Sequence, residues 1–250
     1  MRIYTADELP QHLPDGTPNP DWLALRGSRL TGSDFYLFMS LAKKNELSET
    51  AENKLYEKAL ASLGYETDAG ITTAAMERGT ELESVARELY KAETFNDIRE
   101  VGFVDYESLR AGCSPDGVMY YETPIVDDIY YQKDENGETK VLYGKPKHYI
   151  MRDLDKIDKI IEIKCPNIKN YVRMAMGKIP TQYVIQCQYN MLITGAKSCD
   201  FVVYHPDMAL SVQEIKPDEQ IQADIKTVLE KLNARYDEIL AQIKRFRKND

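Results

Sequence analysis

The stretch IIEIKCPN, residues 160–167, places a glutamate and a lysine inside a run of isoleucines. Side chains alternate between the two faces of a β-strand, so Glu162 and Lys164 share one face of the strand predicted here. Ile161 and Ile163 share the other face, which we expect to be buried. The charged face then meets the protein core, the solvent or a reacting group. The rest of the sequence helps to choose among these three.

The composition predicts a globular protein. The chain has 250 residues, of which 43% are hydrophobic, and this is enough for one large domain with a core. It contains no run of about 18 apolar residues that would span a membrane, and its first residues lack an apolar signal core, so we expect a cytoplasmic protein. Four widely spaced cysteines without a C-x-x-C motif argue against a zinc ribbon or an iron–sulfur run.

The formal net charge of −9 argues against broad binding of nucleic acid, although a local basic groove stays possible. Acidic side chains are also the ligands that hard cations require.

The order of predicted elements favours an α/β fold with a central mixed β-sheet flanked by helices. We expect a single domain over residues 1–250, with an extended arm at residues 1–18. Residues 121–159 are rich in tyrosine and charge, and their segment KDENGETK predicts the tip of a β-hairpin insertion. Asn19 as a cap and Pro20 at the first helical position predict the start of one helix. Further helices are predicted near residues 35–44, 48–63, 71–94, 170–180, 181–195 and 218–247, and strands near 99–106, 116–121, 159–166 and 199–207.

Two carboxylates and a lysine could converge at one sheet edge. Asp116 lies in the turn CSPDG, directly before a predicted strand, and Glu162 and Lys164 lie on a second strand. If the strands are neighbours, the carboxylates could hold one or two Mg²⁺ ions, and the lysine could orient a water molecule. A solvated Glu–Lys pair beside an ordinary turn is the alternative.

The helix predicted at 71–94 has Leu82, Val85, Ala86 and Leu89 on one apolar face, which we expect to be buried. Glu81 and Glu83 both border this face, and periodicity does not choose between them.

A second cluster combines guanidinium and hydroxyl donors. Arg26 and Ser33, with Arg29, Thr31 and Ser28 beside them, could bind phosphate oxygens. A capped helix start with solvated arginines is the alternative reading.

Two amides stand inside an apolar helix. Gln186 and Gln188 are costly to bury unless they form hydrogen bonds, which could go to a metal-bound water, to DNA or to the backbone.

In this order the motifs resemble the phage lambda exonuclease family, the YqaJ-type viral recombinases of the PD-(D/E)xK nuclease superfamily. The resemblance spans residues 20 to about 207. It rests on W-x-x-x-R…T-x-S (Trp22, Arg26, Thr31, Ser33), G-x-x-x-E (Gly79, Glu83), CSPDG (Asp116), EIKCP (Glu162, Lys164) and Q-x-Q-Y (Gln186, Gln188, Tyr189).

The resemblance implies a restriction-endonuclease-like core and a Mg²⁺-dependent 5′→3′ exonuclease. Such enzymes digest the 5′-ended strand of linear double-stranded DNA and leave a 3′ overhang for recombination by strand annealing. They typically form ring-shaped trimers and work beside a single-strand annealing protein. For this chain, the resemblance implies a phage or prophage protein in the cytoplasm of a bacterial host.

The resemblance also implies roles for individual residues. Asp116, Glu162, the Ile163 carbonyl and Glu83 would bind two Mg²⁺ ions, for which Mn²⁺ may substitute, and Glu83 is preferred over Glu81. Lys164 would position the attacking water, and Gln186 would lie beside the metals. Arg26 and Ser33, together with Trp22 and Thr31, would bind the 5′-phosphate and DNA.

Two other functions remain open from the sequence. One is an endonuclease of the same superfamily, and the other is a non-catalytic DNA-binding protein on this fold. The Arg26–Ser33 cluster favours an enzyme that binds DNA ends. The joint presence of Glu83, Asp116, Glu162 and Lys164 argues against a degenerate site.

Overall fold

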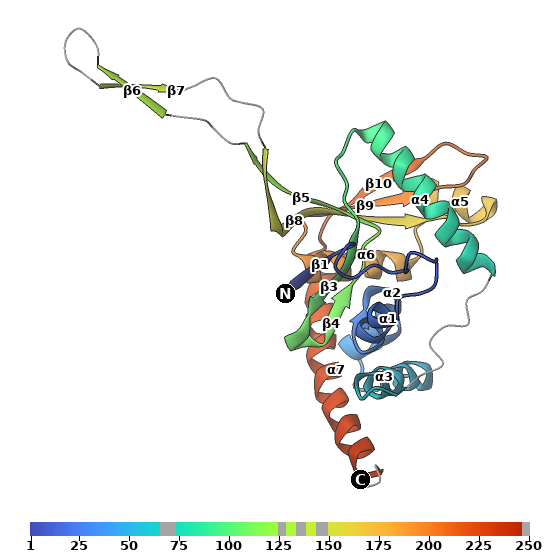
Figure 1. Ribbon diagram of the computed structural model, residues 1–250. Coiled ribbons are helices and arrows are strands. Elements are labelled where there is room, and N and C mark those ends of the chain that lie inside the picture. Colours follow the sequence, from blue (N-terminus) through green and yellow to red (C-terminus); the bar gives the residue numbers. More distant parts are fainter. Residues whose placement is uncertain (66–73, 125–128, 134–138, 144–149, 247–250) are drawn as a thin grey trace.

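The computed structural model shows a mixed α/β fold with two four-stranded sheets flanked by helices (Figure 1). It describes residues 1–65, 74–124, 129–133, 139–143 and 150–246. None of the helices in these ranges is both long and apolar enough to cross a lipid bilayer.

The first sheet has the strand order β1-β3-β4-β2. The strand β3 pairs antiparallel with β1 and β4, and the short strand β2 pairs parallel with β4. This parallel pairing brings the segment after β2 close to the turn that follows β4. The bounds are Arg2–Thr5 (β1), Leu30–Thr31 (β2), Val101–Tyr106 (β3) and Ala111–Cys113 (β4).

The second sheet has the order β10-β9-β8-β5, and the long strand β8 is central in it. It pairs antiparallel with β5 and parallel with β9. A separate antiparallel pair joins β6 to β7. The bounds are Gly117–Pro124 (β5), Ile129–Lys133 (β6), Thr139–Tyr143 (β7), Ile150–Lys164 (β8), Ser198–Val203 (β9) and Ser211–Ile215 (β10).

Side-chain caps and glycine set the ends of several helices. Asn19 accepts a hydrogen bond from the Asp21 backbone at the start of α1, and Gly195 ends α6 in the left-handed conformation. The helices are α1 (Pro20–Gly27), α2 (Gly32–Phe35), α3 (Glu49–Ser62), α4 (Ala74–Thr94), α5 (Ile168–Ala175), α6 (Thr181–Thr194) and α7 (Glu219–Phe246), with 3-10 turns η1 (Tyr36–Ala42) and η2 (Glu107–Leu109).

The strand β8 is buried on both faces at its C-terminal end. Ile161 and Ile163 pack into a cluster with Ala86 and Tyr90 of α4. Glu162 points to the opposite face, where it is 1% exposed and meets α6. The charged face of residues 160–167 therefore meets the protein interior, and the Glu162 carboxylate is buried there.

The predicted fold class is confirmed, with two mixed sheets in place of the single central sheet that we expected. The expected arm at residues 1–18 contains β1, because Ile3 packs against the core and its strand pairs with the edge of β3. The predicted helix at 35–44 is mostly a 3-10 turn.

Part of the range 121–159 belongs to the second sheet, because β8 begins at Ile150 rather than near residue 159. Residues 134–138 of the expected hairpin tip lie outside the described residues. The single domain and the insertion remain predictions.

Candidate functional site

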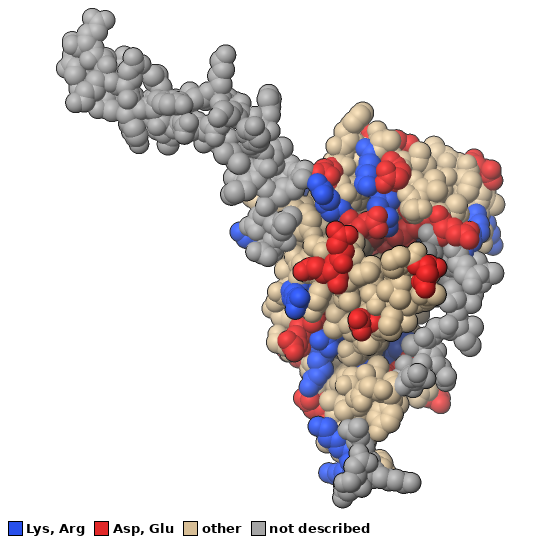
Figure 2. Space-filling view, in the orientation of Figure 1, with Lys and Arg blue, Asp and Glu red and all other residues tan. Residues whose placement is uncertain are grey.

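A cleft of about 720 Å³ opens where the C-terminal end of β8 meets α2, α4 and α6. On the face shown in Figure 2, acidic side chains gather in a band across the middle of the body, with basic side chains beside them. All the residues to which the family resemblance assigns a role line this cleft: Trp22, Arg26, Thr31, Ser33, Glu83, Asp116, Glu162, Ile163, Lys164 and Gln186.

Both oxygens of the buried Glu162 carboxylate accept hydrogen bonds. Oε1 accepts from the Lys164 ammonium and from Gln186 Nε2, the latter at 2.5 Å. Oε2 accepts from Asn190 Nδ2 at 3.2 Å. Gln186 and Asn190 are one helical turn apart on α6, so a single helix supplies both amides. The carboxylate is thereby held in one orientation between β8 and α6.

Asp116 extends the pairing of β5 with β8 by one residue. Its backbone N–H donates to the Ile161 carbonyl at 3.1 Å, and its Oδ2 accepts from the Ile163 N–H at 2.6 Å. The N–H and C=O of one residue in an antiparallel strand point to the same side, so the Ile163 carbonyl also faces the Asp116 side. A carboxylate and a carbonyl oxygen therefore lie at the same sheet edge.

Glu83 brings a third carboxylate to the cleft from α4. Its Oε1 accepts from Arg87 Nη2 at 2.7 Å, and Arg87 Nε donates to the Asp116 carbonyl at 2.7 Å. Glu81, in contrast, is exposed and does not line the cleft. Of the two glutamates that periodicity left open, the structure therefore brings Glu83, and not Glu81, to the cleft.

Sequence reasoning overlooked Arg87, although its spacing of four residues from Glu83 is typical of an ion pair on one helix face. It also placed Val85 and Leu89 on the buried face of α4, which is wrong because both are exposed. Ala86 of the predicted face is buried as expected, and the buried stripe continues through Tyr90, with Arg87 beside it.

Burial and crowding disfavour ionisation of the acidic groups. Burial, together with the charge of Asp116, raises the pKa of Glu83 to about 8. Burial raises the pKa of Glu162 to about 7, although Lys164 opposes the shift, and burial also raises the pKa of Asp116. Burial alone would lower the pKa of Lys164, but Glu162 and Asp116 raise it. The cleft thus favours additional positive charge.

The oxygen chemistry of the cleft fits a hard cation. Within the described parts of the chain, no three His, Cys, Asp or Glu side chains lie close enough together to hold an ion by themselves. The expected donor set has three carboxylates, on Asp116, Glu162 and Glu83, and these line the cleft without meeting at one point. Asp116 and Glu162 with the Ile163 carbonyl would be enough to hold one ion. Mg²⁺ commonly binds one or two carboxylates and keeps several waters.

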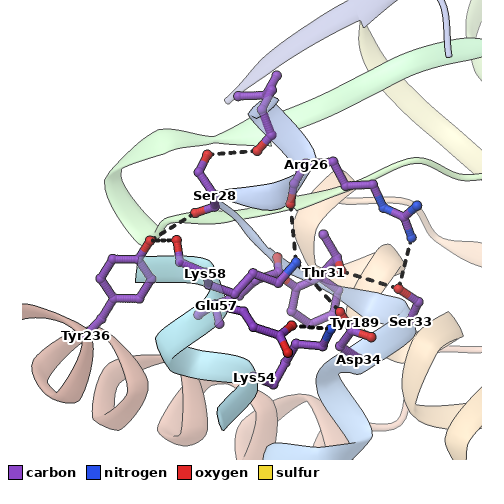
Figure 3. A network of polar contacts seen from close by, with 12 residues as sticks. Arg26, Ser28, Thr31, Ser33, Asp34, Lys54, Glu57, Lys58, Tyr189 and Tyr236 are labelled. Atoms are coloured by element: carbon purple, nitrogen blue, oxygen red, sulfur yellow. Dashed lines mark hydrogen bonds and ion pairs between the residues drawn. The ribbon is translucent and has the colours of Figure 1, made fainter. Parts of the chain in front are cut away.

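The second predicted cluster lies on residues 26–33, a loop that runs from the last turn of α1 through β2 into the first turn of α2 (Figure 3). Arg26 Nη2 donates to Ser33 Oγ at 3.2 Å, and Thr31 Oγ1 lies 3.3 Å from the same oxygen. The Arg26 guanidinium stands 5.1 Å from the centre of the Trp22 ring, whose Nε1 donates to the Gly102 carbonyl. The guanidinium and both hydroxyls are therefore held together at the cleft.

This loop is supported from behind by α3 and α7 (Figure 3). Lys58 Nζ donates to the Arg26 carbonyl at 3.3 Å and lies 3.7 Å from the Asp34 carboxylate. Tyr236 donates its hydroxyl to the Lys58 carbonyl at 2.7 Å. Burial, and to a smaller extent the charge of Arg26, lowers the pKa of Lys58 to about 8. The backbone of the loop is thus fixed from the protein interior.

Two residues that the sequence left open have structural contacts elsewhere. Arg29 forms a forked ion pair with Asp105, with N–O distances of 2.6 and 3.1 Å. Gln188 donates to the Lys216 carbonyl and accepts from the Asp218 N–H. Neither residue lines the cleft.

A family model described as the YqaJ-like viral recombinase domain matches residues 21–197, which is more than half of the chain. The chain belongs to the YqaJ-like viral recombinase family. The family predicted from the ordered motifs is therefore confirmed. The comparison with curated protein sequences finds no match.

Three solved structures similar to this recombinase-family chain are described as exonucleases. An alkaline exonuclease of Laribacter hongkongensis is 27% identical, with a TM-score of 0.66 over 91% of this chain and 97% of its own. The structure of that exonuclease with dAMP is also similar, at 28% identity and the same TM-score and coverage. A phage-related exonuclease of Haemophilus somnus, at 17% identity and a TM-score of 0.55 over 86% of this chain and 96% of its own, shares the fold.

In this YqaJ-like chain, Asn190 joins the two parts of the cleft, and sequence reasoning overlooked it. Its amide nitrogen binds Glu162, while its Oδ1 is buried without a hydrogen-bond partner among the described residues. A Cβ atom added to Gly32 would lie 2.4 Å from this oxygen. Glycine at position 32 therefore lets the loop approach α6 closely.

We predict that Gly32→Ala destabilises the fold. The added methyl would force Asn190 or the loop to move, and overpacking of this kind costs about 1 to 3 kcal/mol. The measurement is the free energy of unfolding by chemical denaturation. Gly27→Ala is the matched control: its Cβ would make an ordinary contact with Ala61 at 3.5 Å, so its stability should be unchanged or slightly higher. Equal stability of the two variants would show that the close approach at Gly32 is not required.

Proposed function

We propose that the chain is a Mg²⁺-dependent 5′→3′ exonuclease that digests the 5′-ended strand of linear double-stranded DNA and leaves a 3′ overhang for strand-annealing recombination. The observation that carries the proposal is that the carboxylate–lysine cluster and the Arg26–Ser33 cluster line one cleft. The similarity to an alkaline exonuclease over nearly the whole of both chains supports it.

The carboxylate side of the cleft would perform the hydrolysis. Asp116, Glu162, the Ile163 carbonyl and Glu83 would hold the metal. When bound, Mg²⁺ or Mn²⁺ supplies a stronger nucleophile and charge stabilisation at the phosphate. The Lys164 ammonium would orient the attacking water through its hydrogens. Gln186 would keep the Glu162 carboxylate in place.

The loop side of the cleft would recognise the DNA end. A guanidinium offers a fork of donors that matches phosphate oxygens, and the Ser33 hydroxyl adds one more. Thr31 would fix Ser33, and the Trp22 ring would support the face of the Arg26 guanidinium. A terminal-phosphate site beside a hydrolytic site suits an exonuclease better than an endonuclease.

The proposal extends to assembly and partners. A ring trimer around DNA would stay attached by topology and would need less long-range attraction, which agrees with the formal net charge of −9. The partner would be a single-strand annealing protein that coats the 3′ overhang. The protein would be encoded by a phage or prophage and act in the bacterial cytoplasm.

We predict that wild-type protein with Mg²⁺ degrades only the 5′-ended strands of a linear duplex and leaves a closed circular plasmid intact. Asp116→Asn and Lys164→Ala should slow degradation at least about a hundredfold, as is usual when a catalytic group is lost. Strand-specific labels followed on denaturing gels measure which strand is degraded and how fast each variant degrades it.

The glutamates of α4 provide an internal control for this experiment. Glu83→Gln should be impaired, whereas Glu81→Gln, on an exposed position, should keep the wild-type rate. Cutting of the closed circle would favour an endonuclease. End binding without cleavage would favour a non-catalytic DNA-binding protein.

We predict that Arg26 gives the enzyme a preference for 5′-phosphorylated over 5′-hydroxyl ends. Arg26→Ala should lose about 1.5 to 3 kcal/mol on phosphorylated ends, the range for hydrogen bonds to charged groups, or about tenfold to a hundredfold in rate. Arg29→Ala is the matched control, because Arg29 is bound to Asp105; it should lower stability and leave the preference intact. The measurement is the rate of digestion of phosphorylated and hydroxyl ends by wild type, Arg26→Ala and Arg29→Ala. A wild-type ratio near one, or a preference that survives in Arg26→Ala, would contradict the assignment.

A further inference from the structure

We propose that Arg87 is a positioning residue that fixes Glu83 and the Asp116 turn relative to each other at the metal side of the cleft. The inference rests on the proposed function, because it concerns the geometry in which these acidic groups would bind a divalent cation. Arg87 itself does not line the cleft and is only 8% exposed.

One guanidinium joins three separate segments of the chain. Nε donates to the Asp116 backbone carbonyl at 2.7 Å, and Nη2 donates to Glu83 Oε1 at 2.7 Å. Nη1 forms an ion pair at 2.8 Å with Glu100, which directly precedes β3. Because the guanidinium is planar and rigid, these bonds fix the directions of all three partners.

The bond to Asp116 distinguishes positioning from simple neutralisation of charge. Its acceptor is a neutral backbone carbonyl, so the bond does nothing to compensate the acidic side chains. A lysine would supply the same charge without a rigid fork. The same turn directs the Asp116 carboxylate to the Ile163 N–H, so Arg87 supports the arrangement of the Asp116 side chain through its backbone.

The burial of Arg87 also argues for a role besides stability. Buried ion pairs recover their desolvation cost only with good geometry, and replacing them with apolar residues is often neutral for folding. Here α4 already packs on β8 through Ala86 and Tyr90, which form an apolar contact with Ile161 and Ile163. What this contact does not supply is a fixed orientation for the Glu83 carboxylate.

Arg87 could act by neutralising charge or by orienting the ligands, and these two roles predict opposite changes in the affinity for Mg²⁺. Removing a positive charge beside a cation site would by itself strengthen Mg²⁺ binding. Removing a group that orients the ligands would weaken it, and losses of this kind typically amount to about 10- to 100-fold in affinity or activity. The sign of the change therefore separates them.

The experiment compares full-length wild type with Arg87→Met and Arg87→Lys. Titration calorimetry with MgCl₂ in the absence of DNA gives the Kd for the metal, and turnover of a 5′-phosphorylated duplex gives kcat and KM. In both variants we expect the Kd for Mg²⁺ to rise about 10- to 100-fold and kcat to fall, with KM for the duplex nearly unchanged. Glu100→Gln is the control, because Glu100 is the exposed partner, and its Kd and kcat should stay close to the wild-type values.

Two results would overturn the inference alone: unchanged or tighter Mg²⁺ binding by Arg87→Met, or full recovery of affinity and kcat in Arg87→Lys. Arg87→Lys keeps the buried charge, so it carries the test if Arg87→Met does not fold. Wild-type protein that neither binds Mg²⁺ nor cleaves the duplex would instead overturn the proposed function, and this inference with it.

Discussion

The carboxylate of Glu162 lies almost fully buried on the central strand β8, and a buried charge costs free energy unless donors surround it. The neighbouring elements supply those donors. Lys164 comes from the same face of the strand, and Gln186 and Asn190 come from successive turns of α6. This requirement explains why an otherwise apolar helix carries amides on its inner face. A protein that needed only stability could replace the whole group with apolar side chains, and this supports the site that we propose here.

The same constraint connects the two halves of the cleft. Asn190 binds Glu162 with its amide nitrogen and lies against Gly32 with its oxygen, so the acidic cluster and the Arg26 loop share one helix as their support. The parallel pairing of β2 with β4 brings the loop to the Asp116 turn, and Lys58 holds it from behind. Hydrolysis and recognition of a DNA end would therefore take place on one rigid frame, which suits an enzyme that removes nucleotides from the end of a strand.

The sequence predicted the features that depend on neighbouring residues, namely the alternation of a strand and the start of a helix. The alternation around Glu162 predicted a strand with a charged face, and Asn19 and Pro20 predicted the start of α1. Which arginine of the loop could face a phosphate depends on Asp105, which lies far away in the sequence and pairs with Arg29. The residues of the loop alone could not separate Arg26 from Arg29, and only the family spacing pointed to Arg26.

The short strand β1 exists because it pairs with β3, and its own residues carry little signal. Periodicity could not separate Glu81 from Glu83, because both flank the apolar stripe of α4. Only the family resemblance made that choice before the structure did.

We attribute the retention of the buried Glu162 carboxylate to the binding of a divalent cation. The most direct test of this role is the thermal unfolding of wild type and Glu162→Gln over a series of Mg²⁺ concentrations. A ligand that binds only the folded state stabilises it by RT ln(1 + [L]/Kd), so the unfolding midpoint keeps rising as the ligand concentration exceeds Kd. Glutamine keeps the shape of the side chain and removes the charge, so both proteins should unfold cooperatively. We expect a midpoint that rises with Mg²⁺ for the wild type and stays flat for Glu162→Gln. An equal rise in both proteins, or no rise in the wild type, would contradict it.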